Sequence, residues 1–249
     1  PILNYLVVNL IKFIIMTRYK VEDLEKFIKL FKPDILIHPS TFQGVFINEI
    51  SYLSHKYKIP FLLLMNSWDN PSLKNTSVYK PSLVGVWGPQ TKFHAKKYMG
   101  IDENKIKILG SAQFQIFKKK YTKTRSLILK EYGFNNDSTF LLYAGSSKGN
   151  DEFKHLLYLE TICKKIDSKL RILYRPHPWL SNPKIAENIL NYDFDIIKID
   201  NTMIDFLQEI KKGTSKSFYI TSYQHTHNIL GAVDIVISPL STILIEALC

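Results

Sequence analysis

Three polar side chains follow an apolar run near the end of the printed sequence. The run covers residues 234–238 (DIVIS) and is typical of a strand, and Ser241, Thr242 and Glu246 come after it. Small hydroxyl residues are favoured at a helix start, where free backbone N–H groups bind anions. Glu246 falls about one turn into the same expected helix. This spacing indicates phosphate at the helix start and sugar hydroxyls at Glu246; an ordinary N-cap followed by a solvated glutamate is the alternative.

Two cationic side chains stand in a loop stiffened by proline. Arg175 and His177 follow the apolar run at residues 171–174, and Pro176 and Pro178 restrict the backbone on both sides of His177. Arginine makes bidentate contacts with phosphate, and histidine adds a further hydrogen-bond donor that becomes cationic near an anion. The loop is therefore a candidate phosphate site, with a surface turn as the alternative.

A loop of small residues follows the apolar run at residues 139–144. Gly145, Ser146 and Ser147 would let a ligand approach the backbone closely, although a plain turn between strand and helix fits them too. The spacing matches neither the phosphate-binding loop of nucleotide triphosphatases nor the dinucleotide fingerprint.

Another candidate lies in the first half of the chain. Asp69 follows the apolar run at residues 59–65, where it is a candidate general base or the first residue of an Asx turn. His225 and His227 stand two residues apart with no third ligand near them, so we expect no metal site.

Apolar runs alternate with helical patterns along the chain, and most of the runs are continuous rather than alternating. That is the pattern of parallel strands covered on both faces. We therefore predict an α/β fold with two Rossmann-like domains. The first spans residues 1–120, a Lys- and Thr-rich linker spans residues 121–138, and the second domain spans residues 139–249.

Composition sets limits on the class of protein. The chain has 249 residues, of which 45% are hydrophobic and 22% charged, so it is neither disordered nor a coiled coil. Two cysteines are too few for a disulfide framework, which favours a reducing cytoplasm. The net charge of +11 permits contact with nucleic acid or with an anionic membrane surface. Because the chain begins with Pro1 and stops inside an expected helix, we expect an internal fragment truncated at both termini.

Several motifs together resemble the GT-B glycosyltransferases, and among them the CDP-glycerol glycerophosphotransferases and bacterial surface-polysaccharide transferases. They are SWDN (67–70), VWGPQTKFHAKKYMGI (86–101), IKILGSAQF (106–114), RPHP (175–178) and SPLSTILIEAL (238–248). The last two are also similar to motifs of bacterial sialyltransferases that use CMP-activated sugars. The resemblance covers residues 34–249, and its specificity comes from the order and spacing of short motifs.

The resemblance implies a nucleotide-sugar-dependent transferase that acts in polysaccharide or glycan biosynthesis. Donor phosphate would contact Arg175, His177, Ser241 and Thr242, and Glu246 would bind the ribose. Gly145 and Ser146 would line the cleft near the transferred group.

Asp69 would face the acceptor, so Asp69 and His177 are the candidate catalytic residues. No cofactor is implied besides the donor substrate. The expected partners are a nucleotide-activated sugar and a glycan or lipid-linked acceptor, with peripheral contact at the inner face of the membrane left open and no nucleic acid.

Three alternatives remain open at this point. On the same fold, a CDP-glycerol-type glycerophosphotransferase or a sugar-nucleotide 2-epimerase would use the same donor-binding groups. A basic nucleic-acid-binding module is the alternative that is not an enzyme, and it requires lysine and arginine to be gathered on one face.

Overall fold

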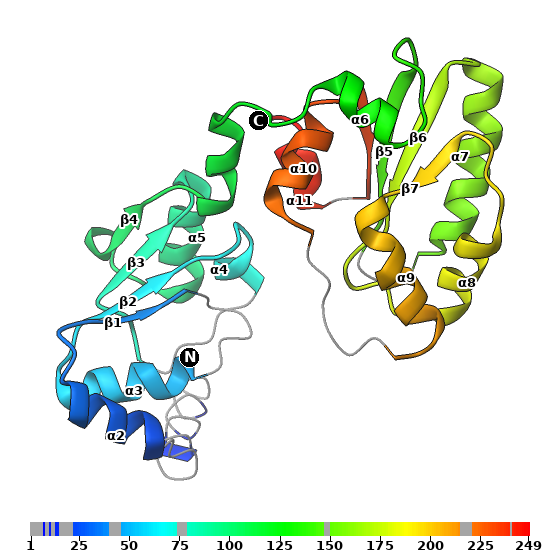
Figure 1. Ribbon diagram of the computed structural model, residues 1–249. Coiled ribbons are helices and arrows are strands. Elements are labelled where there is room, and N and C mark those ends of the chain that lie inside the picture. The colour runs from blue at the N-terminus through cyan, green and yellow to red at the C-terminus, as the bar shows by residue number, and fades with distance from the viewer. Residues whose placement is uncertain are drawn as a thin grey trace. The chain divides into compact units, whose positions relative to one another are not determined.

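A computed structural model shows the chain as two compact units, Pro1–Ala112 and Gln113–Cys249, which we describe separately (Figure 1). It describes residues 22–39, 46–73, 79–146, 150–214, 221–239 and 241–249, together with residues 7, 10, 13 and 14. Ser147, one of the small residues predicted to follow the run at residues 139–144, lies outside the described residues. Within the described residues, no helix is both long and apolar enough to cross a bilayer.

The first unit is a four-stranded parallel sheet in the order β1-β2-β3-β4. Its elements are α2 (Glu22–Phe31), β1 (Leu36–His38), α3 (Ile47–Tyr57), β2 (Phe61–Leu64), α4 (Asn70–Leu73), β3 (Leu83–Val86), α5 (Pro89–Met99), η1 (Glu103–Lys105) and β4 (Ile106–Ile108). Phe61, Leu63, Val84 and Val86 are almost fully buried at its centre. Helix α5 ends at Gly100, whose positive φ of 61° suits glycine.

The second unit is also a four-stranded parallel sheet, in the order β7-β6-β5-β8. Its elements are η2 (Ala112–Lys118), α6 (Arg125–Glu131), β5 (Thr139–Ala144), α7 (Glu152–Ile166), β6 (Leu170–Arg175), α8 (Pro183–Asn191), β7 (Ile197–Ile199), η3 (Asn201–Met203), α9 (Ile204–Lys211), α10 (Tyr223–Leu230), β8 (Ile235–Ile237) and α11 (Thr242–Glu246). All of its strand pairs are parallel, so their carboxyl ends meet at one edge.

Successive side chains of the central strands alternate between the two faces of this second sheet. Leu141, Tyr143 and Tyr174 pack with residues of α7, α8 and α9. Leu142 and Leu173 point the other way and pack with residues of α6 and α10. Both faces are covered, as the continuous apolar runs predicted, and Figure 1 shows helices on either side of β5 and β6.

The residues expected to form a linker belong to the second unit. Ile128 and Leu129 of α6 are fully buried against the sheet. Arg125 at the start of α6 donates to the backbone carbonyls of Ala232 and Ser138 and pairs with Asp234. Helix α6 is therefore part of the core, because its apolar side chains cover one face of the sheet.

Residues 114–123, which we call the strap, cross helix α10. The rings of Phe117 and Tyr121 lie against His227, with ring centroids 5.3 and 4.4 Å away. Tyr121 also covers Gly231 so closely that a Cβ atom there would overlap its ring. The Oδ1 atom of Asn228 accepts hydrogen bonds from the backbone N–H groups of Thr122 at 2.9 Å and Lys123 at 3.3 Å.

Replacing Asn228 by alanine should destabilise the protein, because two backbone donors of the strap lose their acceptor. We expect the free energy of unfolding to fall by about 1–3 kcal/mol in urea titrations. Asn191→Ala is the matched control, since Asn191 is exposed and accepts only a 3.3 Å hydrogen bond from Lys211. Equal stability of the two variants would show that Asn228 does not hold the strap.

Candidate functional site

Arg175 is the last residue of β6, and its side chain lies on the same face as Leu173, toward α6 and α10. The residue is only 7% exposed. Its Nε atom donates to Asp200 Oδ2 at 2.8 Å, and Nη1 donates to the hydroxyl of Thr226 on α10 at 3.0 Å. Its Nη2 atom is buried and has no hydrogen-bond partner among the described residues. One donor of this guanidinium is therefore not satisfied by the described part of the protein.

Asp200 directly follows β7 and is fully buried. While Oδ2 accepts from Arg175, Oδ1 accepts from the backbone N–H and hydroxyl of Thr202 at 3.0 and 2.8 Å. It also contacts His225 Nε2 at 2.9 Å and the hydroxyl of Tyr132 at 3.4 Å. We call Arg175, Asp200, Thr202, His225 and Thr226 the arginine cluster.

Electrostatics keeps Asp200 ionised inside this cluster. Burial by itself raises the pKa of the carboxyl, but the hydrogen bond from His225 and the charge of Arg175 outweigh it and hold the pKa well below its usual range. Burial and the charge of Asp200 raise the pKa of Tyr132. A buried guanidinium is tolerated only with such a partner, so removing Asp200 would leave an uncompensated charge in the interior.

Glu246, on the last turn of α11, lies close enough to Arg175 to interact electrostatically. Its side chain is 9% exposed, and burial raises the pKa of its carboxyl while the charge of Arg175 partly opposes that rise. The same carboxylate contributes, after burial, to the raised pKa of Tyr223. Arg175 and Glu246, which belong to separate sequence motifs, thus lie within range of electrostatic interaction.

Strand β8 pairs with β5 in the sheet, and Ser241 and Thr242 follow the carboxyl end of β8. Ser241 occupies the N-cap position of α11, but its side chain makes no capping hydrogen bond. Its hydroxyl is instead 2.9 Å from the hydroxyl of Ser238. The helix start is where the sequence predicted it, and its length is five residues.

A second polar cluster lies on the opposite face of the sheet, because Tyr174 points away from Arg175. The Tyr174 hydroxyl donates to the carboxylate of Glu152, the first residue of α7. Glu152 Oε1 accepts the backbone N–H of Ser146 at 3.0 Å. The carboxylate lies so near Gly145 that a Cβ atom at that position would overlap it. Glu152 therefore fixes the backbone at Gly145 and Ser146, by close packing against the first and a hydrogen bond to the second.

Burial raises the pKa of Glu152 to about 7, although the hydrogen bonds from Tyr174 and Ser146 work in the opposite direction. On the same helix, His155 Nδ1 lies 2.8 Å from the hydroxyl of Tyr143. The loop after β5 adjoins the arginine cluster through the backbone, since the Gly145 N–H donates to the Arg175 carbonyl at 2.9 Å.

His177 sits two residues beyond β6 and is half-buried. Its Nδ1 atom accepts the backbone N–H of Trp179 at 3.0 Å, which places the ring proton of the neutral form on Nε2. Burial lowers the pKa of His177, which favours that neutral form. In this neutral form, the Nε2–H group of His177 can donate one hydrogen bond.

Asp69 lies in the first unit, whereas the other predicted site residues lie in the second. It follows β2 and immediately precedes α4, and its Oδ1 atom accepts the hydroxyl of Ser67 at 2.6 Å. Its backbone carbonyl accepts the N–H of Ser72 at 3.1 Å. These contacts shape a tight turn at the end of the strand.

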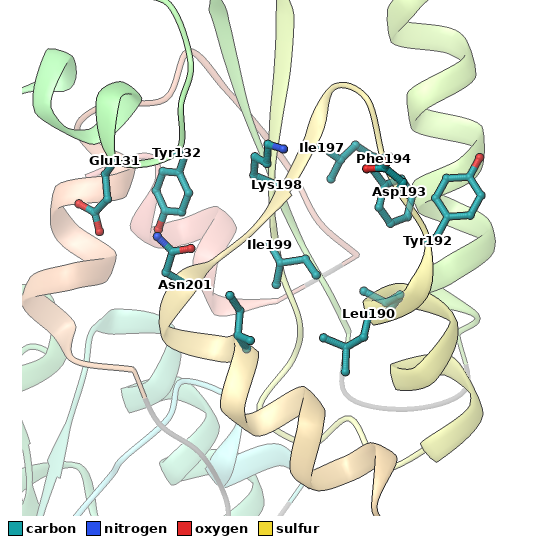
Figure 2. Close-up of a pocket in the computed structure, with 12 residues that line it drawn as sticks. Glu131, Tyr132, Leu190, Tyr192, Asp193, Phe194, Ile197, Lys198, Ile199 and Asn201 are labelled. Atoms are coloured by element: carbon teal, nitrogen blue, oxygen red, sulfur yellow. The ribbon is translucent and has the colours of Figure 1, made fainter.

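A pocket of about 280 Å³ opens beside the edge strand β7 and contains none of the predicted site residues (Figure 2). Apolar side chains of β7 and α8 line it, including Leu190, Ile197 and Ile199. Tyr132 forms part of its wall, and the Tyr132 hydroxyl donates to Asp200.

The described residues contain no group of three His, Cys, Asp or Glu side chains placed to hold a metal ion.

Sequence reasoning missed Asp200, Thr226 and Glu152. Asp200 follows an apolar strand, so the rule that singled out Arg175 and His177 could have found it. Thr226 gave no such signal, because only the packing of α10 against β6 brings it to Arg175.

The raised pKa of Glu152 predicts a stability that depends on pH. The folded protein holds this proton more tightly than the unfolded chain, whose glutamates titrate near 4.5, so folding stability falls as pH rises from about 4.5 to 7. Compared with Glu152→Gln, the parent protein should lose up to about 3 kcal/mol between pH 5 and pH 8, measured by urea unfolding.

The control for this experiment is Glu187→Gln, which changes an exposed glutamate that pairs with Lys184. The pKa of Glu187 is lowered, so its stability difference from the parent should stay constant over the same pH range. A flat difference for Glu152→Gln as well would contradict the raised pKa.

Comparisons with known proteins support the fold. No family model matches the sequence, and no curated protein sequence matches it significantly. Among solved structures, UDP-GlcNAc 2-epimerase from Neisseria meningitidis superposes with a TM-score of 0.56 at 14% identity, covering 87% of this chain and 57% of that chain. A putative UDP-N-acetylglucosamine 2-epimerase from Listeria monocytogenes gives 0.55 at 14% identity, with 87% and 54% covered.

A glycosyltransferase from Rickettsia africae reaches a TM-score of 0.47 at 18% identity, covering 86% of this chain and 53% of that chain. The fold assignment therefore rests on the first two structures. This chain spans a little over half the length of those structures. The two parallel sheets and this similarity confirm the expected architecture: the chain has a GT-B fold.

Proposed function

We propose that the second unit binds the nucleotide of an activated sugar and that the protein is a glycosyltransferase. The observation that carries this proposal is Arg175, whose guanidinium is held at Nε and Nη1 while the buried Nη2 atom has no partner among the described residues. Glu246 lies near it at the same edge of the sheet. A fixed donor beside a buried acceptor suits a ligand that carries both phosphate and hydroxyl groups.

The other predicted residues receive roles consistent with their positions. Nη2 of Arg175 donates to a phosphate oxygen, and the carboxylate of Glu246 accepts from ribose hydroxyls. The Nε2–H group of His177 donates a further hydrogen bond to the leaving phosphate. Ser241 and Thr242 contact phosphate at the start of α11, and Gly145 and Ser146 lie near the transferred sugar.

The proposed reaction is a displacement at the anomeric carbon. An acceptor hydroxyl forms the new carbon–oxygen bond as the bond between the anomeric carbon and the phosphate oxygen breaks. The electron pair leaves with the nucleotide, and Arg175 and His177 stabilise the added negative charge. The acceptor gives up its hydroxyl proton to a general base, a role that we propose for Asp69. A glycan or a lipid-linked sugar supplies the hydroxyl.

One alternative has direct support from the comparisons. The two structures with TM-scores above 0.5 described above are UDP-GlcNAc 2-epimerases, so epimerisation of a sugar nucleotide is our second candidate. A CDP-glycerol-type transferase would use the same cationic groups with attack at phosphorus. Nucleic-acid binding is less favoured, because many lysines of the described chain pair with neighbouring carboxylates, as Lys96 does with Glu103 and Lys164 with Asp195.

Nucleotide binding is tested by thermal unfolding of the full-length protein with UDP, CDP, CMP and sugar nucleotides. We expect protection by one nucleotide class, and we expect Arg175→Lys to weaken that binding about tenfold or more, since lysine lacks the forked donors. Arg171→Lys is the control, because Arg171 lies on the same strand and donates only to nearby backbone carbonyls. Equal affinity of both variants would remove Arg175 from the donor site.

Product analysis separates the two enzyme candidates. With the protecting sugar nucleotide, a transferase releases free nucleotide at a rate that rises when an acceptor sugar is added. An epimerase converts the sugar nucleotide to its 2-epimer without any acceptor, which proton NMR of the anomeric region detects. Formation of the epimer as the main product would replace the transferase assignment.

A further inference from the structure

The direction of Arg175 Nη2 is fixed, because Nε and Nη1 of the same side chain form hydrogen bonds with Asp200 and Thr226. Free arginine side chains sample many rotamers, and ordering one costs about 2 kcal/mol of conformational entropy. Here the Nε–Oδ2 contact of 2.8 Å with Asp200 and the Nη1 contact of 3.0 Å with Thr226 fix the guanidinium plane before any ligand arrives.

Asp200 is itself fixed more strongly than Arg175. Its Oδ1 atom accepts from Thr202 and contacts His225 at 2.9 Å, so the carboxylate cannot rotate without losing several hydrogen bonds. It has no exposed surface, and both of its oxygens already accept hydrogen bonds from the protein. Of the side chains that Asp200 contacts, we take Arg175 as the one through which it acts on a bound molecule, because Arg175 Nη2 has no partner among the described residues.

We propose that Asp200 is a positioning residue of the donor site, which holds the Arg175 guanidinium so that Nη2 faces the donor, and which does not itself contact the donor. This inference rests on the proposed function. Asp200 lies outside the sequence motifs from which the nucleotide-binding function was proposed.

Charge and position lead to opposite expectations for this residue. Asp200 is an anion beside the cation that receives phosphate, so on charge alone its removal would strengthen the binding of an anionic nucleotide. If its role is to position Arg175, its removal weakens binding although the site becomes more positive. Asp200→Asn keeps the shape of the side chain and removes the charge, so it separates the two expectations.

The experiment measures dissociation constants by calorimetry for UDP, CDP and CMP on the full-length protein and on three variants. These are Asp200→Asn, Arg175→Ala and the double variant. We expect Asp200→Asn to weaken binding about tenfold. Adding Asp200→Asn to Arg175→Ala should cause no further loss, because the positioning residue then has nothing to position. Circular dichroism confirms that each variant is folded.

Two results would overturn the inference. One is unchanged or tighter nucleotide binding by Asp200→Asn, and the other is a further loss of affinity in the double variant equal to the loss in the single one. If Asp200→Asn does not fold, Asp200→Glu takes its place, because it keeps the charge and moves the carboxylate by one methylene; unchanged binding by that variant counts against the role in the same way.

Failure of the proposed function gives a different pattern. If no nucleotide binds to the parent protein, or if Arg175→Ala binds as tightly as the parent, then the donor site is wrongly assigned and not merely the role of Asp200. The calorimetric series therefore tests the inference separately from the function on which it depends.

Discussion

The buried ion pair between Arg175 and Asp200 is the interaction on which the candidate site depends. A guanidinium that is 7% exposed at a strand end is tolerated only with a partner that is ionised and hydrogen-bonded in place. Asp200 meets that requirement because Thr202 and His225 hold its other oxygen. The pair joins the ends of β6 and β7, and Thr226 and His225 connect it to α10. One donor of Arg175, Nη2, has no partner among the described residues.

The alternation of side chains along β6 gives the carboxyl edge two different polar clusters. Arg175 lies on the face covered by α6 and α10, and Tyr174, one residue earlier, lies on the face covered by α7. The Tyr174 hydroxyl donates to Glu152, which in turn accepts the backbone N–H of Ser146. Helix α10 is shared in a similar way: His225 and Thr226 belong to the arginine cluster, while His227 and Asn228 contact the strap.

Local patterns were enough to predict most of the regular structure from the sequence. Continuous apolar runs predicted β5, β6 and β8, and small hydroxyl residues predicted the start of α11 at Ser241. The interpretation of residues 121–138 as a linker rested on composition, and composition does not show that Ile128 and Leu129 cover a sheet face. Such packing depends on residues far away in the chain.

The resemblance implied that Arg175 and Glu246 both contact the donor. It could not show that Asp200 and Thr226 take two of the guanidinium nitrogens, since that follows from the sheet order and from the docking of α10. Nor could spacing show that the Ser146 N–H points inward to Glu152. The sequence was enough to predict which residues to examine at the site, but not which side chains form hydrogen bonds with them.

The most direct test of Arg175 as a donor-binding residue is a crystal structure of the full-length protein with the nucleotide that protects it against thermal unfolding. We predict electron density for a phosphate or ribose oxygen within about 3.2 Å of Arg175 Nη2, with the Arg175–Asp200 contact unchanged. A nucleotide bound elsewhere, or Nη2 bonded to another protein group in that complex, would contradict this role of Arg175.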